Sequence, residues 1–192
     1  MCGIAGKINF NNEPVNIGEI KKMTDLLVHR GPDDEGQWVE NNIGLGSRRL
    51  AIIDISSAGH MPMIYLDRYV ITYNGEIYNF ESERKKLEKY GYKFNSNTDT
   101  EVIIALYDKY GVNCLKYLRG MFSFAIWDRK KKILFAARDR LGKKPFKYYL
   151  DKNKFVFASE LKAIDVPRIL DHEAMWDYLT YQYVPFPNTG FL

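Results

Sequence analysis

Cys2 is the residue of this chain whose position best suits covalent chemistry. Initiator methionine is normally removed before a small second residue, so the mature chain begins with a residue that carries both a thiol and an α-amine. A free α-amine has a pKa of roughly 7.7 to 8.0, against about 10.4 for a lysine amine, and can accept the thiol proton near neutral pH. Cys2 thus has the components of an N-terminal nucleophile. A cysteine at position 2 is by itself more often incidental than catalytic, so other residues must decide.

Three further places carry side chains that bind amides, carboxylates or amines, and each also has an ordinary structural explanation. Asn74-Gly75 follows a predicted strand, and Asn-Gly is the strongest short hairpin signal. Arg49 could form a surface ion pair. Asp99 could cap the helix that begins near Thr100, and this role is compatible with a second one. The spacing alone does not choose between these explanations.

The order of short motifs along the chain is more specific than any one of these residues. It resembles that of class II glutamine amidotransferases, and its last three motifs resemble the asparagine synthetase branch. The resemblance covers essentially the whole chain. The motifs are CGIAG (2–6), HRGPDDEG (29–36), RRLAIID (48–54), AGHMPM (58–63), NGEIYN (74–79), DTEV (99–102), RGMFSFAIWD (119–128), ARDRLGKKP (137–145) and FASELKAI (157–164).

The resemblance implies a role for each candidate residue. Cys2 is the nucleophile, while the Asn74 side chain and the Gly75 N–H form an oxyanion hole, in which one donor is typically worth about 3 kcal/mol of barrier. Arg49 binds the α-carboxylate of glutamine with its planar fork. The substrate-binding set that the resemblance implies is Arg49, Leu50, Ile53, Asn74, Gly75, Glu76 and Asp99, with Asp99 and Glu76 holding the ammonium group.

The reaction implied is hydrolysis of the glutamine side-chain amide through a Cys2 thioester, which needs no metal or cofactor in this domain. In the resembled synthetases, a second domain uses ATP and Mg²⁺ to transfer the ammonia. We therefore predict a glutaminase domain at 1–165 and, at 166–192, the start of a linker to that synthetase domain. The alternative is a catalytically silent glutamine-sensing or partner-docking domain of the same fold, because a chain that kept Met1 would lack the free amine at Cys2.

Composition fits a folded, non-membrane protein of 192 residues with 46% hydrophobic and 15% aromatic residues. The net charge of +4 comes from interleaved charges, so we expect no nucleic-acid partner. Cys2 and Cys114 are too few for a disulfide framework, and no membrane-length apolar run occurs. We expect a cytoplasmic protein, leave a homodimer open, and interpret Cys114, His29 and His60 as structural.

Local patterns predict an α+β fold with helices on the outer faces of two mainly antiparallel sheets. The resemblance makes this a four-layer α/β/β/α sandwich of the N-terminal-nucleophile hydrolase type. Asn16 and Glu19 suggest a capping box, and Asn79 a helix cap. The predicted strands are 3–10, 43–55, 69–73 ending at Asn74-Gly75, and a meander made of the segments from 121, 133–138 and 154–158. The predicted helices begin after Asn16 and Asn79 and at 100.

Overall fold

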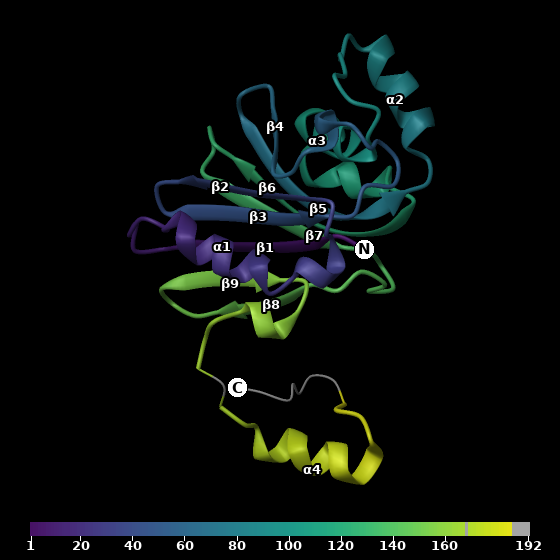
Figure 1. Cartoon of the computed structure of the whole chain (residues 1–192). Helices are drawn as coiled ribbons and strands as arrows, with labels where there is room; N and C mark the ends of the chain where they lie inside the picture. The colour runs from purple at the N-terminus through teal and green to yellow at the C-terminus, as the bar shows by residue number, and fades with distance from the viewer. Residues whose placement is uncertain (168, 186–192) are drawn as a thin grey trace.

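Two antiparallel sheets form the body of the chain in a computed structural model that describes residues 1–167 and 169–185 (Figure 1). The five-stranded sheet has the order β2-β3-β1-β9-β8, and the four-stranded sheet the order β4-β5-β6-β7. The strands are β1 (Gly3–Asn9), β2 (Asp34–Glu40), β3 (Ile43–Arg49), β4 (Met63–Tyr65), β5 (Tyr69–Ile77), β6 (Gly120–Asp128), β7 (Ile133–Arg138), β8 (Lys147–Leu150) and β9 (Lys154–Ala158).

The helices cover the outer faces of the two sheets. Helix α1 packs on the five-stranded sheet, and α2 and α3 pack on the four-stranded sheet, as Figure 1 shows. The α-helices are α1 (Ile17–Asp25), α2 (Phe80–Lys89), α3 (Asp99–Tyr110) and α4 (His172–Tyr181), and the 3₁₀ turns are η1 (Val28–Arg30), η2 (Ser57–Gly59), η3 (Gly111–Lys116) and η4 (Leu161–Ala163). None of the helices in the described ranges is long and apolar enough to span a membrane.

Three apolar clusters separate the four layers. Between the sheets, Ile4, Leu45 and Phe157 from one sheet meet Val70 and Trp127 from the other. Their neighbours along each strand point the opposite way, as the period of two requires, into clusters beneath α1 and beneath α3. Burial of each large apolar side chain stabilises the fold by roughly 2 kcal/mol. The predicted α+β sandwich is thus confirmed.

The positions of the helix N-termini were predicted well, but not all the capping hydrogen bonds expected there are formed. Asn16 caps α1, since its side chain accepts a hydrogen bond from the Gly18 N–H at 2.7 Å. Glu19 pairs with Lys7 instead, so the predicted capping box is only half formed. Asn79 occupies the N-cap position of α2 but forms no cap hydrogen bond with its side chain.

Two strand predictions were wrong in ways that matter for the site. Strand β3 ends at Arg49, and residues 50–56 form a loop rather than the end of a strand 43–55. Strand β5 continues through Asn74-Gly75, which pair with Ser123 and Phe122 of β6, so the hairpin explanation for Asn-Gly is also wrong. A favourable turn sequence is here overridden by pairing with a long neighbouring strand.

The predicted meander is correct for β6 and β7, which pair with each other, but not for the segment 154–158. That segment is β9 and pairs with β1 in the other sheet, next to β8, which was not predicted. Local alternation of side chains does not tell which sheet a strand joins.

The segment after residue 165 carries α4, which lies apart from the two sheets in Figure 1. Asp171 caps this helix with hydrogen bonds from the N–H groups of Glu173 and Ala174. Of the predicted linker start at 166–192, residues 168 and 186–192 lie outside the described part. The division at residue 165 therefore stays a prediction.

Candidate active site

Cys2 lies directly before β1, where it faces the end of β3. Gly3 pairs with Arg48, which places the Cys2 thiol beside Leu50. The Leu50 N–H donates to Cys2 Sγ at 3.4 Å, and the Leu50 carbonyl oxygen lies 3.7 Å from the same sulfur. Arg30 Nε donates to the Cys2 carbonyl at 3.0 Å. Residue 2 is thus held in one place by contacts from the end of β3 and from η1.

The environment of the Cys2 thiol combines burial with nearby positive charge. Burial raises the pKa of the thiol, and the Leu50 N–H, the chain-terminal amine, Arg49 and Lys144 all oppose that rise. Met1 precedes Cys2 in the structure, with its side chain 56% exposed, so the Cys2 nitrogen there is a peptide amide. The positive groups favour the thiolate, which is the nucleophilic form.

Asn74 lies on the face of β5 that looks toward the five-stranded sheet. Thr72, two residues earlier on that face, donates its hydroxyl to the Gly46 carbonyl of β3 at 2.9 Å. Beyond this hydrogen bond, β3 and β5 both continue toward the end of the sandwich where the N-terminus lies (Figure 1). The Asn74 side chain is 1% exposed, and its Nδ2 has no hydrogen-bond partner in the described part of the chain. A buried amide donor without a partner is costly and calls for a functional explanation.

The Gly75 N–H points away from β6, toward the side of β5 that has no paired strand at this residue. Phe122 lies opposite Gly75 on β6, and both its N–H and its carbonyl form hydrogen bonds with Asp139, on the side of β6 that faces away from β5. Gly75 and Phe122 therefore form a non-hydrogen-bonded pair. The pairing of β4 with β5 stops at Ile71. A Cβ at Gly75 would collide with the backbone of β6, so glycine is required here.

Arg49 is 7% exposed and anchors the loop that follows β3. Its Nη1 donates to the Ser56 carbonyl at 3.2 Å, and its Nη2 donates to the Asp54 carbonyl. A Cβ at Gly59 would overlap Nη2, so this glycine leaves room for the guanidinium. The alternative explanation of Arg49 as a surface ion pair is wrong, because its hydrogen-bond partners are the backbone carbonyls of Ser56 and Asp54.

The carboxyl group of Asp54 ties the same loop to the segment that precedes α3. It accepts hydrogen bonds from the Ser56 hydroxyl and N–H and, across the site, from the Asn97 N–H at 3.0 Å. These donors lower the pKa of Asp54 to about 2, the Ser56 hydroxyl contributing most. The loop of Arg49 is therefore linked to the start of the helix that carries Asp99.

Asp99 lies at the first turn of α3 and is 4% exposed. The alternative explanation of Asp99 as the helix cap is wrong, since the N-cap is Thr98, whose side chain accepts from the Glu101 N–H. Asp99 Oδ2 accepts instead from the Tyr73 hydroxyl at 2.6 Å and the Ile77 N–H at 2.9 Å. Burial raises the pKa of Asp99, and these donors oppose the rise. Asp99 therefore lies on the same edge of β5 as the Gly75 N–H.

The remaining predicted residues lie around this centre. Glu76 is half-buried, on the opposite face of β5 from Gly75 and the same face as Asn74, and its carboxylate has no ion pair in residues 1–167 and 169–185. Leu50 touches Cys2 through its backbone. The side chain of Ile53 is 39% exposed in the loop.

Three residues near Cys2 were missed as site residues. Arg30 lies in the motif HRGPDDEG and Lys144 in ARDRLGKKP, but the sequence of a motif does not show which distant residues an Arg or Lys side chain will contact. Tyr73 lies on the opposite face of β5 from Asn74, and a buried tyrosine there suggests only core. The burial of Cys2 and the positive charges around it depend on the fold, and the spacing of residues along the sequence could not reveal them.

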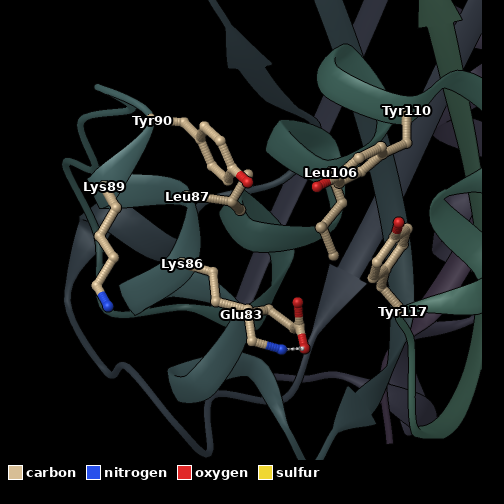
Figure 2. Close-up of a pocket in the computed structure, with 8 residues that line it drawn as sticks. All are labelled: Glu83, Lys86, Leu87, Lys89, Tyr90, Leu106, Tyr110 and Tyr117. Atoms are coloured by element: carbon tan, nitrogen blue, oxygen red, sulfur yellow. Dashed lines mark hydrogen bonds and ion pairs between the residues drawn. The ribbon is translucent and has the colours of Figure 1, made fainter.

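Two cavities have different chemistry. One of about 440 Å³ is bordered by Arg49, the loop after β3 and the start of β2, but its lining does not include Cys2, Asn74 or Asp99. Another of about 330 Å³ lies between α2, α3 and η3 (Figure 2). It is lined by Tyr90, Tyr110, Tyr117 and aliphatic side chains, and its carboxylate, Glu83, is paired with Lys86 at 2.8 Å. The lining of this second cavity includes no cysteine and none of the predicted site residues, so it is separate from the Cys2 site.

Comparison with known proteins shows the family of the chain. The model of the glutamine amidotransferase domain family matches residues 1–192. The chain belongs to this family. An asparagine synthetase 3 (glutamine-hydrolysing) of Bacillus subtilis is 45% identical over 99% of this chain. A putative asparagine synthetase 2 (glutamine-hydrolysing) of Methanocaldococcus jannaschii is 43% identical over 97% of it.

The fold and the family predicted from the sequence are confirmed. The glutamine phosphoribosylpyrophosphate amidotransferase of Bacillus subtilis superposes with a TM-score of 0.72 at 21% identity, covering 86% of this chain and 43% of that one. This glutamine amidotransferase domain spans 40% and 32% of the lengths of the Methanocaldococcus and Bacillus synthetases.

Proposed function

We propose that the mature domain hydrolyses the side-chain amide of glutamine through a thioester on Cys2. The observation that carries the proposal is the buried, unpartnered Asn74 Nδ2 at the end of the sandwich that holds the Cys2 thiol. Together with the Gly75 N–H it supplies two donors for the negative charge that develops on an attacked amide oxygen. Family membership supports the same reaction.

The reaction proceeds in two halves once Met1 has been removed. The α-amine of Cys2 takes the thiol proton, and the thiolate attacks the amide carbon to give an oxyanion beside Asn74 and Gly75. The α-ammonium then gives its proton to the leaving nitrogen, and ammonia departs from the thioester. A water molecule, deprotonated by the same amine, attacks the thioester carbonyl, so glutamate leaves and the thiol is restored.

Recognition of free glutamine uses both charged ends of the molecule. The guanidinium of Arg49 exchanges its two carbonyl partners for the α-carboxylate, which makes stronger, charge-assisted hydrogen bonds. The substrate ammonium binds Asp99, assisted by Glu76, while the backbone near Leu50 and Ile53 borders the side chain. Asp54 keeps the Arg49 loop close to α3 during this exchange.

We further propose that the ammonia is passed to an ATP-dependent synthetase part of a longer protein that makes asparagine. The relatives named above are asparagine synthetases, and this chain corresponds to less than half of their length. In this proposal the glutaminase domain is 1–165, and the segment 166–192 begins the connection. ATP and Mg²⁺ serve that other part, and the protein works in the cytoplasm.

The test compares two forms of the protein for release of glutamate and ammonia from glutamine. One form has lost Met1, as verified by intact mass. The other carries a short peptide extension before Cys2 that blocks the amine. The processed form should turn over and the extended form should be at least about 100-fold slower, because general-base assistance is worth this much. Equal turnover in the two forms would exclude the α-amine as base, and no turnover in either would favour a silent domain.

A further inference from the structure

Lys144 is a lysine buried beside the nucleophile, and a dedicated loop holds it there. It is 5% exposed. The carboxyl group of Asp139 organises the loop between β7 and β8 by accepting hydrogen bonds from the N–H groups of Phe122, Leu141, Lys143 and Lys144. Arg138 Nε donates to the Lys144 carbonyl at 2.6 Å. Such a network fixes the position of the lysine.

The ammonium group of Lys144 has no acidic partner among the described residues. Its Nζ contacts the Met1 sulfur at 3.3 Å, a soft and neutral neighbour. Buried charges are normally paired, since moving an unpaired charge out of water is unfavourable. A buried cation without an ion-pair partner needs an explanation. One candidate counter-ion is the Cys2 sulfur in its thiolate form, on which Lys144 acts electrostatically.

The other groups around position 2 do not cancel this charge. Arg30 reaches the Cys2 carbonyl, and its charge is balanced by Glu160 at 3.0 Å. Arg49 adds a second cation, and the Tyr73 hydroxyl is committed to Asp99. The ionisable groups around position 2 include Arg30, Arg49, Tyr73 and Lys144, with Glu76, Asp99 and Glu160 behind them. The Asp139 carboxylate lies next to the Lys144 backbone, where four N–H groups donate to it.

We propose that the buried Lys144 ammonium prepares position 2 for catalysis by stabilising the Cys2 thiolate and by keeping the mature α-amine uncharged. Both effects follow from one charge, because a cation favours a neighbouring anion and disfavours a neighbouring cation. After loss of Met1, Lys144 no longer has its sulfur neighbour and shares this end of the fold with the new α-amine. An amine kept neutral near pH 7 is ready to accept the thiol proton.

This inference rests on the proposed function, but its test has a readout that does not need glutamine. Lys144→Met removes the charge and keeps a long apolar side chain, and Lys144→Arg keeps the charge. Lys143→Met is the matched control, since Lys143 lies next to it in the same loop and is less buried. In each processed protein, alkylation of Cys2 by iodoacetamide and kcat/KM for glutamine are measured from pH 5 to pH 10, after circular dichroism has verified the fold.

In Lys144→Met the alkylation profile should move to higher pH and reach the same limiting rate at high pH. For every pH unit that the profile moves, the alkylation rate at pH 7 should fall about tenfold, because the thiolate fraction falls by that factor. The acid limb of kcat/KM should move the same way, while Lys144→Arg and Lys143→Met should follow the wild type. Should Lys144→Met not fold, Lys144→Gln takes its place.

Superimposable alkylation profiles for the wild type and Lys144→Met would overturn the inference, as would an equal displacement of the profile in Lys143→Met. A wild type that does not hydrolyse glutamine would contradict the proposed function, and the alkylation profiles would still decide the role of Lys144.

Discussion

The two cysteines lie in regions that treat a thiol in opposite ways. Cys114, in η3, is fully buried beneath α3 near Leu118, and burial raises the pKa of its thiol to about 12, opposed only by the Leu115 backbone. Burial also raises the pKa of Cys2, but a backbone N–H, Arg49 and Lys144 work against it there. Reactivity is thus set by donors and charges around the sulfur rather than by residue type.

The largest expected effect tests whether only one of the two thiols is catalytic. Cys2→Ala should lower kcat/KM for glutamine hydrolysis by at least about 1,000-fold, because it removes the nucleophile. Cys114→Ala should leave kcat/KM within about twofold of wild type. A glutamate-release assay on both variants checks this, and substantial loss of activity in Cys114→Ala would break the comparison.

The second prediction concerns the unpartnered Asn74 amide at the Cys2 end of the sandwich. Asn74→Ala should reduce kcat by about 100- to 1,000-fold with a smaller change in KM, since its hydrogen bond strengthens as the oxyanion forms. Asn42→Ala is the control, because the Asn42 side chain bonds the Asn9 carbonyl in the turn between β2 and β3. An equal loss in both variants, measured by steady-state kinetics, would point to general destabilisation instead.

The third prediction tests whether the charge of the Asp99 carboxylate is needed to bind glutamine, through the pH dependence of KM. Asp99→Asn should raise KM roughly 10- to 100-fold, as expected for a lost charged hydrogen bond. Burial raises the pKa of Asp99, so as the pH falls this carboxylate loses its charge at a higher pH than free aspartate. The wild-type KM should therefore rise as the pH falls through that pKa, while the KM of Asp99→Asn stays flat. Parallel KM profiles from pH 4 to pH 8 would argue against this role.

The smallest effect is on stability, and there the order of the two cysteines should reverse. Cys114→Ala leaves a gap in the core and should lower the free energy of unfolding by about 1–2 kcal/mol. Cys2→Ala changes a half-buried position and should cost less. Urea denaturation followed by circular dichroism compares them, and a larger loss in Cys2→Ala would show that Cys2 is also a packing residue.

The candidate residues could be named from the sequence because each sits in a motif with a fixed neighbour order. Cys2, Asn74-Gly75, Arg49 and Asp99 all fall at one end of the sandwich, where β1 begins and β3 and β5 end. The α+β architecture followed from alternation in the strands and from helix signals such as Asn16 before α1.

What could not be predicted depended on partners distant in sequence. The Asn-Gly pair stays in a strand because β6 continues alongside it. The hydrogen bond from Arg30 to Cys2 spans 28 residues. The contact between Lys144 and Met1 spans 143. Periodicity carries no information about such pairs.

The central claim is that the nucleophilic thiol and its free amine belong to one residue, Cys2 of the processed chain. Its most direct test is labelling with a diazoketone analogue of glutamine, followed by intact-mass measurement and peptide mapping. The account predicts a single adduct on Cys2 of the chain that lacks Met1, slowed by excess glutamine, and none on Cys114. An adduct on Cys114, equal labelling of a chain that keeps Met1, or a rate unaffected by glutamine would contradict it.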